Sequence, residues 1–440
     1  VNLPSKKIKM TETQLNSWGH ADLVTDTLPG MSLVKAYEFV KNKPSQTVIV
    51  AVADTGLDIE HEDLKPVLWT NKKEVLGNGK DDDKNGYIDD QHGWNFLGDT
   101  YKENLEITRM VRMYRDKFGK RTADQIPANQ LHEFQKYKKL EEDVTTQLTK
   151  SRSKHYYDLS FVARGSDAMG AYIFDTPPYG NANVDNSQEG ESHGSHVAGI
   201  IGASRGNGKG MDGVANQVQL MSLRIVPDGD EYDKDVALAI RYAADNGAKV
   251  INTSFGKGYS PNKEWVLDAM RYAAKKDVLI VNAAGNSGSD IDVEKTYPND
   301  APDMINEVSD NVLTVGALSP TYNEKMVARF SNYGKRNVDV FAPGVQIYST
   351  VPESSYGRKS GTSMAAPCAA GVAALVRSYY PQLSASQVKH ILMNSGTKVD
   401  LKVIRPGTKD ELVDFSTLSV SGRIINAYNA LQMADKMVNK

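Results

Sequence analysis

The stretch Lys359-Ser360-Gly361-Thr362-Ser363-Met364-Ala365-Ala366-Pro367 places one serine where a glycine-bounded turn gives way to a run of small residues. Ser363 is therefore a candidate nucleophile. A serine hydroxyl is a weak nucleophile at its ordinary pKa, so it requires a neighbouring base that a third group holds in place. The same serine could instead cap the helix expected over residues 364–379, because serine is common at that position.

The sequence supplies a base and an orienting acid far from this serine. His193 lies in the run Gly190-Glu191-Ser192-His193-Gly194-Ser195-His196-Val197-Ala198-Gly199, and Asp54 ends a β-rich run that breaks at Gly56. The chain order acid, histidine, serine differs from that of the α/β-hydrolases. The five residues 361–365 also end in alanine, where the nucleophile elbow of those enzymes has glycine.

Two other kinds of protease site fit these motifs less well. Asp54-Thr55-Gly56 could be a strand-ending turn or half of an aspartic-protease pair, but the chain has no second Asp-Thr-Gly or Asp-Ser-Gly. His193 and His196 could be core histidines or metal ligands. A zinc-protease helix requires histidines four residues apart with a glutamate beside the first, and neither condition is met.

Together these motifs resemble the subtilisin-like serine protease (subtilase) family, over about residues 47–98 and 189–395. The resemblance implies a serine endopeptidase in which His193 accepts the Ser363 proton and Asp54 orients the imidazole. Asn286 matches the family's side-chain donor to the oxyanion, which is needed because negative charge develops on the scissile carbonyl oxygen. A catalytically silent, calcium-dependent peptide-binding or scaffold protein on the same fold is the alternative.

The resemblance also implies a substrate cleft. A peptide would lie as an added strand against Ser254, Phe255 and Gly256 and against the loop of residues 227–230. The other wall of the primary specificity pocket would consist of Ala283, Ala284 and Gly285. Thr296 would lie at the base of this pocket, where we expect it to disfavour large aromatic side chains.

The hydrophobic pattern predicts an α/β fold of the subtilisin-like type, with a mostly parallel central sheet and helices on both faces. Buried strands are expected over residues 47–53, 218–226, 249–254, 278–283 and 312–318, and helices over residues 233–246 and 262–276. Asp54 and Asn286 both fall at strand ends, where the functional crevice of such sheets lies.

We expect one peptidase domain over residues 1–440 with two departures from the compact family pattern. The N-terminal extension of residues 1–46 resembles no inhibitory propeptide, so a propeptide was removed or this member folds without one. An insertion over about residues 100–188 contains two amphipathic patterns, over residues 104–117 and 127–149, the second with Pro127 in its first turn. A solvated helical pair is the simpler interpretation; a substrate-gating lid or a partner surface is the other.

The acidic run from Asp81 to Asp90 has the oxygen-ligand rhythm of a calcium loop. Its expected ligands are Asp81, Asp83, Asn85, the carbonyl of Tyr87, and Asp89 or Asp90. His92 stands where an EF-hand has its bidentate glutamate, and a solvated acidic turn is the alternative. A second calcium site, implied by the resemblance, would use Asp63 and Asn207.

The composition excludes several other classes of protein. A net charge of −3 gives no basic face for nucleic acid, and no run of about eighteen apolar residues predicts a membrane span. Cys368, the only cysteine, cannot form an intramolecular disulfide and is expected to be buried among small neighbours.

The chain begins at Val1 without a signal segment, which indicates a processed or recombinant form. A secreted or periplasmic location is expected from the family, with proteins or peptides as substrates.

Overall fold

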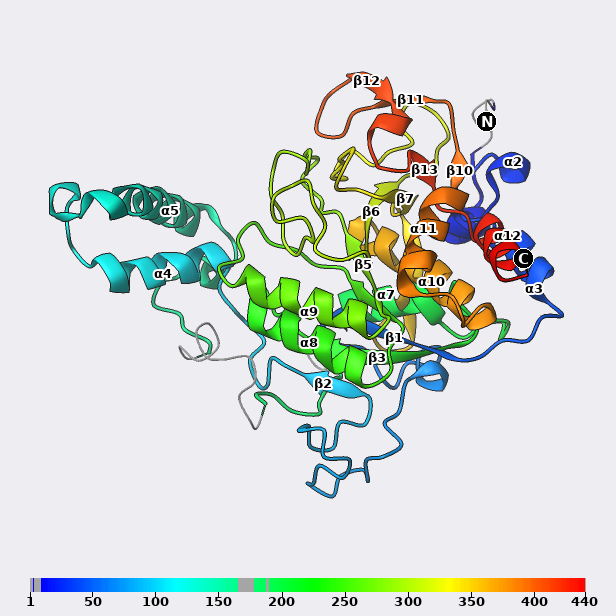
Figure 1. The fold of residues 1–440 in the computed structure, drawn as a ribbon, viewed down its shortest axis with the longest axis horizontal. Helices are drawn as coiled ribbons and strands as arrows, with labels where there is room; N and C mark the ends of the chain where they lie inside the picture. Colours follow the sequence, from blue (N-terminus) through cyan, green and yellow to red (C-terminus); the bar gives the residue numbers. More distant parts are fainter. Residues whose placement is uncertain (1–2, 4–8, 165–177, 187–189, 440) are drawn as a thin grey trace.

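The structure is a computed structural model that describes residues 3, 9–164, 178–186 and 190–439. At its centre the described chain forms a nine-stranded sheet (Figure 1). Its strands are, in spatial order, β10 (Thr397–Lys398), β13 (Arg423–Ile424), β7 (Val340–Pro343), β6 (Val312–Leu318), β5 (Leu279–Ala283), β4 (Val250–Thr253), β1 (Val48–Asp54), β3 (Val218–Arg224) and β2 (Gly93–Asn95). Neighbouring strands are parallel, except that β10 is antiparallel to β13. The predicted mostly parallel α/β fold is therefore confirmed.

The five predicted strands are β1, β3, β4, β5 and β6, and each agrees with its expected range to within two residues at either end. These strands are buried along almost their whole length, which is why they appear in the sequence as continuous apolar runs. The sequence did not reveal β2, β7, β10 and β13. They contain two to four residues, too few to show a periodicity.

Successive residues of β1 face opposite sides of the sheet, as the alternation of a strand requires. Val50 and Val52 belong to one apolar cluster, whereas Ala51 and Ala53 belong to another. The first cluster includes α3 (Leu33–Val40), α7 (His193–Gly202), α10 (Thr362–Tyr379), α11 (Ala385–Ser395) and α12 (Ala427–Val438). The second includes α8 (Asp233–Asp245) and α9 (Lys263–Lys275), the two helices predicted there.

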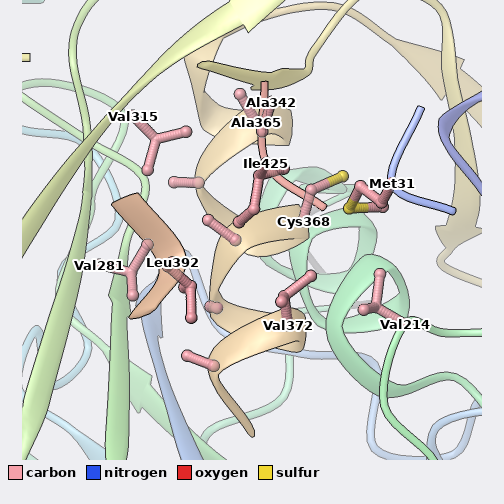
Figure 2. Packing of buried hydrophobic residues seen from close by; sticks show 14 of the residues in the cluster. Met31, Val214, Val281, Val315, Ala342, Ala365, Cys368, Val372, Leu392 and Ile425 are labelled. Atoms are coloured by element: carbon pink, nitrogen blue, oxygen red, sulfur yellow. The ribbon is translucent and has the colours of Figure 1, made fainter. Parts of the chain in front are cut away.

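The helix α10 is the buried centre of the first cluster. Figure 2 shows Val281 and Val315 of the sheet on one side of α10, and Met31 and Val214 on the other. Cys368 lies on this helix and is 2% exposed, as expected, and burial raises the pKa of its thiol. The predicted start at residue 364 was two residues late, because α10 begins at Thr362 and its N-cap is Gly361.

Elements from both ends of the chain pack together on this face. Two short helices, α1 (Glu12–Ser17) and α2 (Leu23–Asp26), precede α3, and Trp18 and Met31 are buried in the same cluster as α10. The helix α3 packs against α12, and the Ala427 N–H donates a hydrogen bond to the Met31 carbonyl oxygen over 2.8 Å. The described part of the predicted extension is thus built into the main core.

The insertion contains two long helices, α4 (Glu106–Phe118) and α5 (Leu131–Lys150), which project from the body of the molecule (Figure 1). They bury an apolar cluster of their own that includes Val111, Phe118 and Val144. The expectation of Pro127 in the first turn of the second helix was wrong, because residues 128–130 form a separate 3₁₀ turn. Residues 165–177 and 187–188 of the insertion lie outside the described residues.

The remaining elements are small. They are the hairpin of β8 (Ile347–Val351) and β9 (Ser355–Lys359), the pair β11 (Lys402–Ile404) and β12 (Leu412–Asp414), and the 3₁₀ turns Trp18–His20, Lys65–Val67, Ala123–Gln125, Ala128–Gln130, Lys154–Tyr156 and Phe415–Thr417. Within the described ranges, no helix is both long and apolar enough to cross a membrane.

Candidate active site

Asp54 and His193 meet at the carboxyl end of the central strand. Asp54 is the last residue of β1 and is fully buried, and His193 is the first residue of α7. The His193 Nδ1 atom lies 2.6 Å from Asp54 Oδ1, which also accepts a hydrogen bond from the Thr55 N–H. The hydroxyl of Thr55 accepts in turn from the Gly194 N–H over 2.9 Å, so the end of β1 is fixed to the start of α7.

The carboxylate of Asp54 raises the pKa of the His193 imidazole. Burial lowers the pKa of His193, but the negative charge of Asp54 and its hydrogen bond outweigh this effect, with help from the charge of Glu191. The net result is a pKa raised above the ordinary 6.5. The pKa of His196 shifts in the other direction, because burial lowers it to about 3. The His196 Nε2 atom lies within hydrogen-bond distance of the carbonyl oxygens of Ile347 and Gly357. His196 therefore fits a core histidine better than a metal ligand.

Ser363 lies in the first turn of α10, which packs beside α7. Its hydroxyl donates a hydrogen bond to the Ser254 carbonyl oxygen over 3.1 Å, and its own carbonyl oxygen accepts from the Ser254 hydroxyl over 2.9 Å. Among the described residues no hydrogen bond joins Ser363 to His193. The structure therefore contains the acid–histidine half of the expected relay, while the serine hydroxyl is turned toward Ser254. Catalytic hydrogen bonds are often long or misaligned before substrate binds.

The side chain of Asn286 is oriented by Thr362, a residue that sequence reasoning missed. The Asn286 Oδ1 atom accepts hydrogen bonds from the Thr362 N–H (2.8 Å) and hydroxyl (2.9 Å). These two contacts fix the Asn286 side chain through its carbonyl oxygen and leave its amide nitrogen for another partner. Asn286 is exposed, and no described residue accepts a hydrogen bond from this nitrogen. The sequence offered one indication that Thr362 belongs to the site, namely its position directly before Ser363.

A cavity of about 410 Å³ is lined by both Ser363 and Asn286. Its lining includes five of the residues predicted for the substrate cleft, namely Phe255, Gly256, Ala283, Gly285 and Thr296. Sequence reasoning missed Lys257, Lys295, Tyr297 and Asn332, which also line it. Of the other predicted residues, Ser254 is buried and contacts Ser363, whereas Ala284 is buried beside a separate hollow of about 20 Å³ that also contacts Thr296.

The acidic loop brings together a set of carboxylates that differs from the predicted one. Oxygen atoms of Glu74, Asp83 and Asp90 all lie within 4.8 Å of one another. Glu74 was not expected, because it precedes the acidic run and belongs to no recognisable ligand pattern. No lysine or arginine in the described ranges forms an ion pair with these three groups, and burial raises the pKa of Asp90 to about 6.

The other predicted ligands of this loop make hydrogen bonds within it. The carboxylate of Asp81 accepts from the Asn85 and Gly86 N–H groups, and that of Asp89 accepts from the N–H groups of residues 78 and 79. The Asn85 amide nitrogen donates to Asp90 over 2.8 Å. Tyr87 packs edge-on against Trp94 and Tyr242.

The two residues predicted for a second calcium site are in contact. The Asn207 amide nitrogen donates to Asp63 Oδ1, and the Tyr356 hydroxyl donates to Asp63 Oδ2 over 2.7 Å. Asp63 is fully buried. Both of its oxygen atoms therefore have protein donors.

Comparison with known proteins relates this chain to one family of proteases. A family model described as the subtilase family matches residues 45–412. Thermitase from Thermoactinomyces vulgaris is 37% identical over 253 residues, which are 57% of this chain and 79% of thermitase. The cell wall-associated protease of Bacillus subtilis (strain 168) is 38% identical over 231 residues, which are 52% of this chain and 24% of that protein. The chain spans about half or less of the length of several such curated relatives.

A solved structure titled as proteases from Pseudoalteromonas arctica PAMC 21717 superposes with a TM-score of 0.57 at 22% identity, covering 95% of this chain and 97% of the other. At this level of identity the superposition supports the fold alone.

The pKa of His193 can be measured by following the imidazole resonances against pH by NMR, with the resonance assigned from a His193→Gln variant. We expect a value above 6.5 in the unsubstituted protein. Asp54→Asn removes the charge and leaves the burial, so the pKa should fall below 6.5. Asp116→Asn, at an exposed position of α4, should leave it unchanged. An unchanged His193 pKa in Asp54→Asn would contradict the assigned pairing.

Proposed function

The chain belongs to the subtilase family, and on that premise we propose that it is a serine endopeptidase that hydrolyses peptide bonds in proteins. The observation that carries the proposal is the 2.6 Å contact of His193 with the buried Asp54, at a site where Ser363 and Asn286 border one cavity. A nucleophile, a base, an orienting acid and an oxyanion donor are the groups that acyl transfer by serine requires.

In the proposed mechanism the Ser363 hydroxyl turns from Ser254 to the free nitrogen of His193 when a substrate is bound. His193 accepts the proton as Oγ attacks the peptide carbonyl carbon, and then donates it to the departing amine. Asp54 keeps Nδ1 protonated and stabilises the imidazolium that forms. Water then hydrolyses the acyl-enzyme by the same steps, and Ser363 regains its proton.

The negative charge on the carbonyl oxygen would be stabilised by two donors. One is the amide nitrogen of Asn286, whose side chain is held through Oδ1 by Thr362 and borders the cavity. The other is the Ser363 N–H, which lies in the first turn of α10, where backbone N–H groups have no partner within the helix. Both donors belong to groups that are already fixed before substrate binds, which favours stabilisation of the transition state.

We propose that the substrate is a protein or peptide bound in an extended conformation along residues 254–256 and 227–230. The cavity beside Ser363 would then hold the side chain on the acyl side of the scissile bond. Thr296 borders this cavity, so its methyl and hydroxyl groups reduce the space available to a large ring. A secreted or periplasmic location remains a prediction from the family resemblance, and both alternatives for a propeptide, removal or folding without one, stay open.

We also propose that calcium stabilises the protein. The converging oxygens of Glu74, Asp83 and Asp90 fit a hard cation, which prefers carboxylate ligands, and the described residues supply no cationic side chain that neutralises them. Asp81 and Asp89 would support the loop through its N–H groups rather than bind the ion. A second calcium ion at Asp63 and Asn207 remains a prediction, and it would have to displace the donors now held by Asp63.

A fluorophosphonate probe tests the proposed activity, because it reacts only with an activated serine. We expect covalent labelling of the native protein and none after Ser363→Ala, read out by mass spectrometry of the intact protein. A control substitution, Ser160→Ala in the insertion, should leave the labelling unchanged. Failure of the native protein to react would favour the alternative of a catalytically silent peptide-binding protein. Labelling that survives Ser363→Ala would refute the assigned nucleophile.

The role of Thr296 can be tested with matched peptides that differ only in the residue before the scissile bond. We expect cleavage after alanine or leucine to be faster than after phenylalanine, and Thr296→Gly to raise kcat/KM for the phenylalanine peptide by about tenfold, the scale of a steric pocket effect. Rapid cleavage after phenylalanine by the unsubstituted protein would exclude this role.

Calcium binding can be tested by thermal unfolding with the ion and with a chelator. A ligand that binds only the folded state stabilises it by about 2.7 kcal/mol at a hundred times its Kd, so calcium should raise the Tm. Asp83→Asn should abolish most of this increase, whereas Asp116→Asn should preserve it. The proposal fails if the Tm of the unsubstituted protein is the same in calcium and in chelator.

A further inference from the structure

A buried group of charged side chains joins the insertion to Lys257, which lines the cavity beside Ser363, and to residues 230 and 231, at the end of the predicted substrate loop. Glu106 and Arg109 lie in the first turns of α4, and Lys257 follows directly after residues 254–256. Their side chains are 3%, 0% and 2% exposed, respectively. Charged groups are almost never buried to this extent unless they are paired, so their partners define a fixed arrangement.

One set of contacts fixes the backbone of residues 230 and 231, at the end of the predicted substrate loop. The Glu106 N–H donates to Asp230 Oδ2 over 2.8 Å. The Arg109 guanidinium donates to the Asp230 carbonyl oxygen (2.9 Å) and to the Glu231 carbonyl oxygen (3.1 Å). The start of α4 thus binds both the side chain and the main chain of Asp230.

A second set of contacts fixes Lys257, which lines the cavity. The Lys257 ammonium donates to Glu106 Oε2 (2.7 Å) and to the Glu231 carbonyl oxygen (2.8 Å), and it pairs with Asp233 over 2.9 Å. The main chain of Lys257 exchanges two hydrogen bonds with Tyr297, which lines the cavity next to Thr296.

Glu106 is the point at which the two sets meet. Its carboxylate accepts hydrogen bonds from Lys257, which lines the cavity, and from Arg109 of α4, which also binds the carbonyl oxygens of residues 230 and 231. The charges of Lys257 and Arg109 hold the pKa of Glu106 below its ordinary value in spite of its burial. Glu106 therefore connects the loop of residues 227–231 to the segment of residues 254–257 through a group that the insertion supplies.

We propose that Glu106 and Arg109 are positioning residues of the peptide-binding cleft, so that the insertion is a fixed brace between its two walls rather than a movable gate. The proposal rests on the proposed endopeptidase function, because that function assigns the cleft to an extended peptide. The brace acts on walls that bind peptide main chain, so its loss should weaken binding of extended peptides and leave the reactivity of Ser363 intact.

Peptide binding in a Ser363→Ala background tests the brace without requiring turnover. Fluorescence anisotropy gives the Kd of a fluorescein-labelled octapeptide substrate for two proteins, Ser363→Ala and the double variant Ser363→Ala/Glu106→Ala. We expect the Kd to rise about tenfold or more, since small displacements of positioning groups have effects of this size. Glu106→Gln keeps an oxygen that accepts from Lys257 and should recover part of the affinity. The control Glu133→Ala removes the α5 partner of Lys117 on α4, away from residues 106 and 109, and should change the Kd by less than about twofold.

A second measurement separates a positioning role from a general effect on the fold. With Ser363 present, Glu106→Ala should be labelled by a small fluorophosphonate at a rate within about twofold of the unsubstituted rate, while KM for the octapeptide rises. An unchanged Kd in folded Glu106→Ala, or a labelling rate that falls together with the affinity, would overturn the proposal. If Glu106→Ala does not fold, the Kd and the labelling rate are measured for Glu106→Gln and Arg109→Lys, and the same outcomes support or overturn the proposal.

The same experiments keep the two proposals apart. An unsubstituted protein that binds the octapeptide but does not react with the fluorophosphonate would refute the endopeptidase and leave the comparison of Kd values valid. A Ser363→Ala protein that does not bind the octapeptide would refute the assigned cleft and the brace together.

Discussion

The contact between the His193 ring and the Asp54 carboxylate is the interaction on which the candidate site depends. Asp54 is fully buried, and its second oxygen, Oδ2, has no hydrogen-bond partner among the described residues. A buried carboxylate with so few donors is costly unless a cation or a strong donor faces it. The imidazole supplies that donor, so the acid and the histidine stabilise each other. The end of β1 and the start of α7 are held together by this pair and by Thr55.

The parallel sheet explains how distant parts of the chain reach one place. The strands β1 and β5 end at the same edge, so Asp54 and the segment that leads to Asn286 leave the sheet on one side. The helix α10 then presents Ser363 in its first turn, against the main chain of residue 254 at the end of β4. The insertion adds buried charged side chains next to this site, because Glu106 of α4 pairs with Lys257, which lines the cavity.

Much of this arrangement could be predicted from the sequence, because the signals were local or belonged to a family pattern. The buried strands appear as apolar runs, and the acid, histidine and serine each lie within a distinctive motif. The remaining contacts could not be predicted, because they join residues that are far apart in the sequence and belong to no motif. Glu106 and Arg109 occupy a helix whose pattern is typical of a solvated surface, and only the fold shows that Lys257 meets them. Glu74 joins the acidic loop in the same way, with no motif of its own.

The packing of α3 against α12 places the beginning and the end of the chain in one layer of the core. Met31 and Ser32 form hydrogen bonds with residues 427 and 426, almost four hundred positions away. The packing of α3 against α12 can therefore form only after the intervening chain has been made. Contacts of such high sequence separation slow folding and leave apolar surface open in the meantime. Completion of this part of the core, and with it the surroundings of α10, requires both α3 and α12.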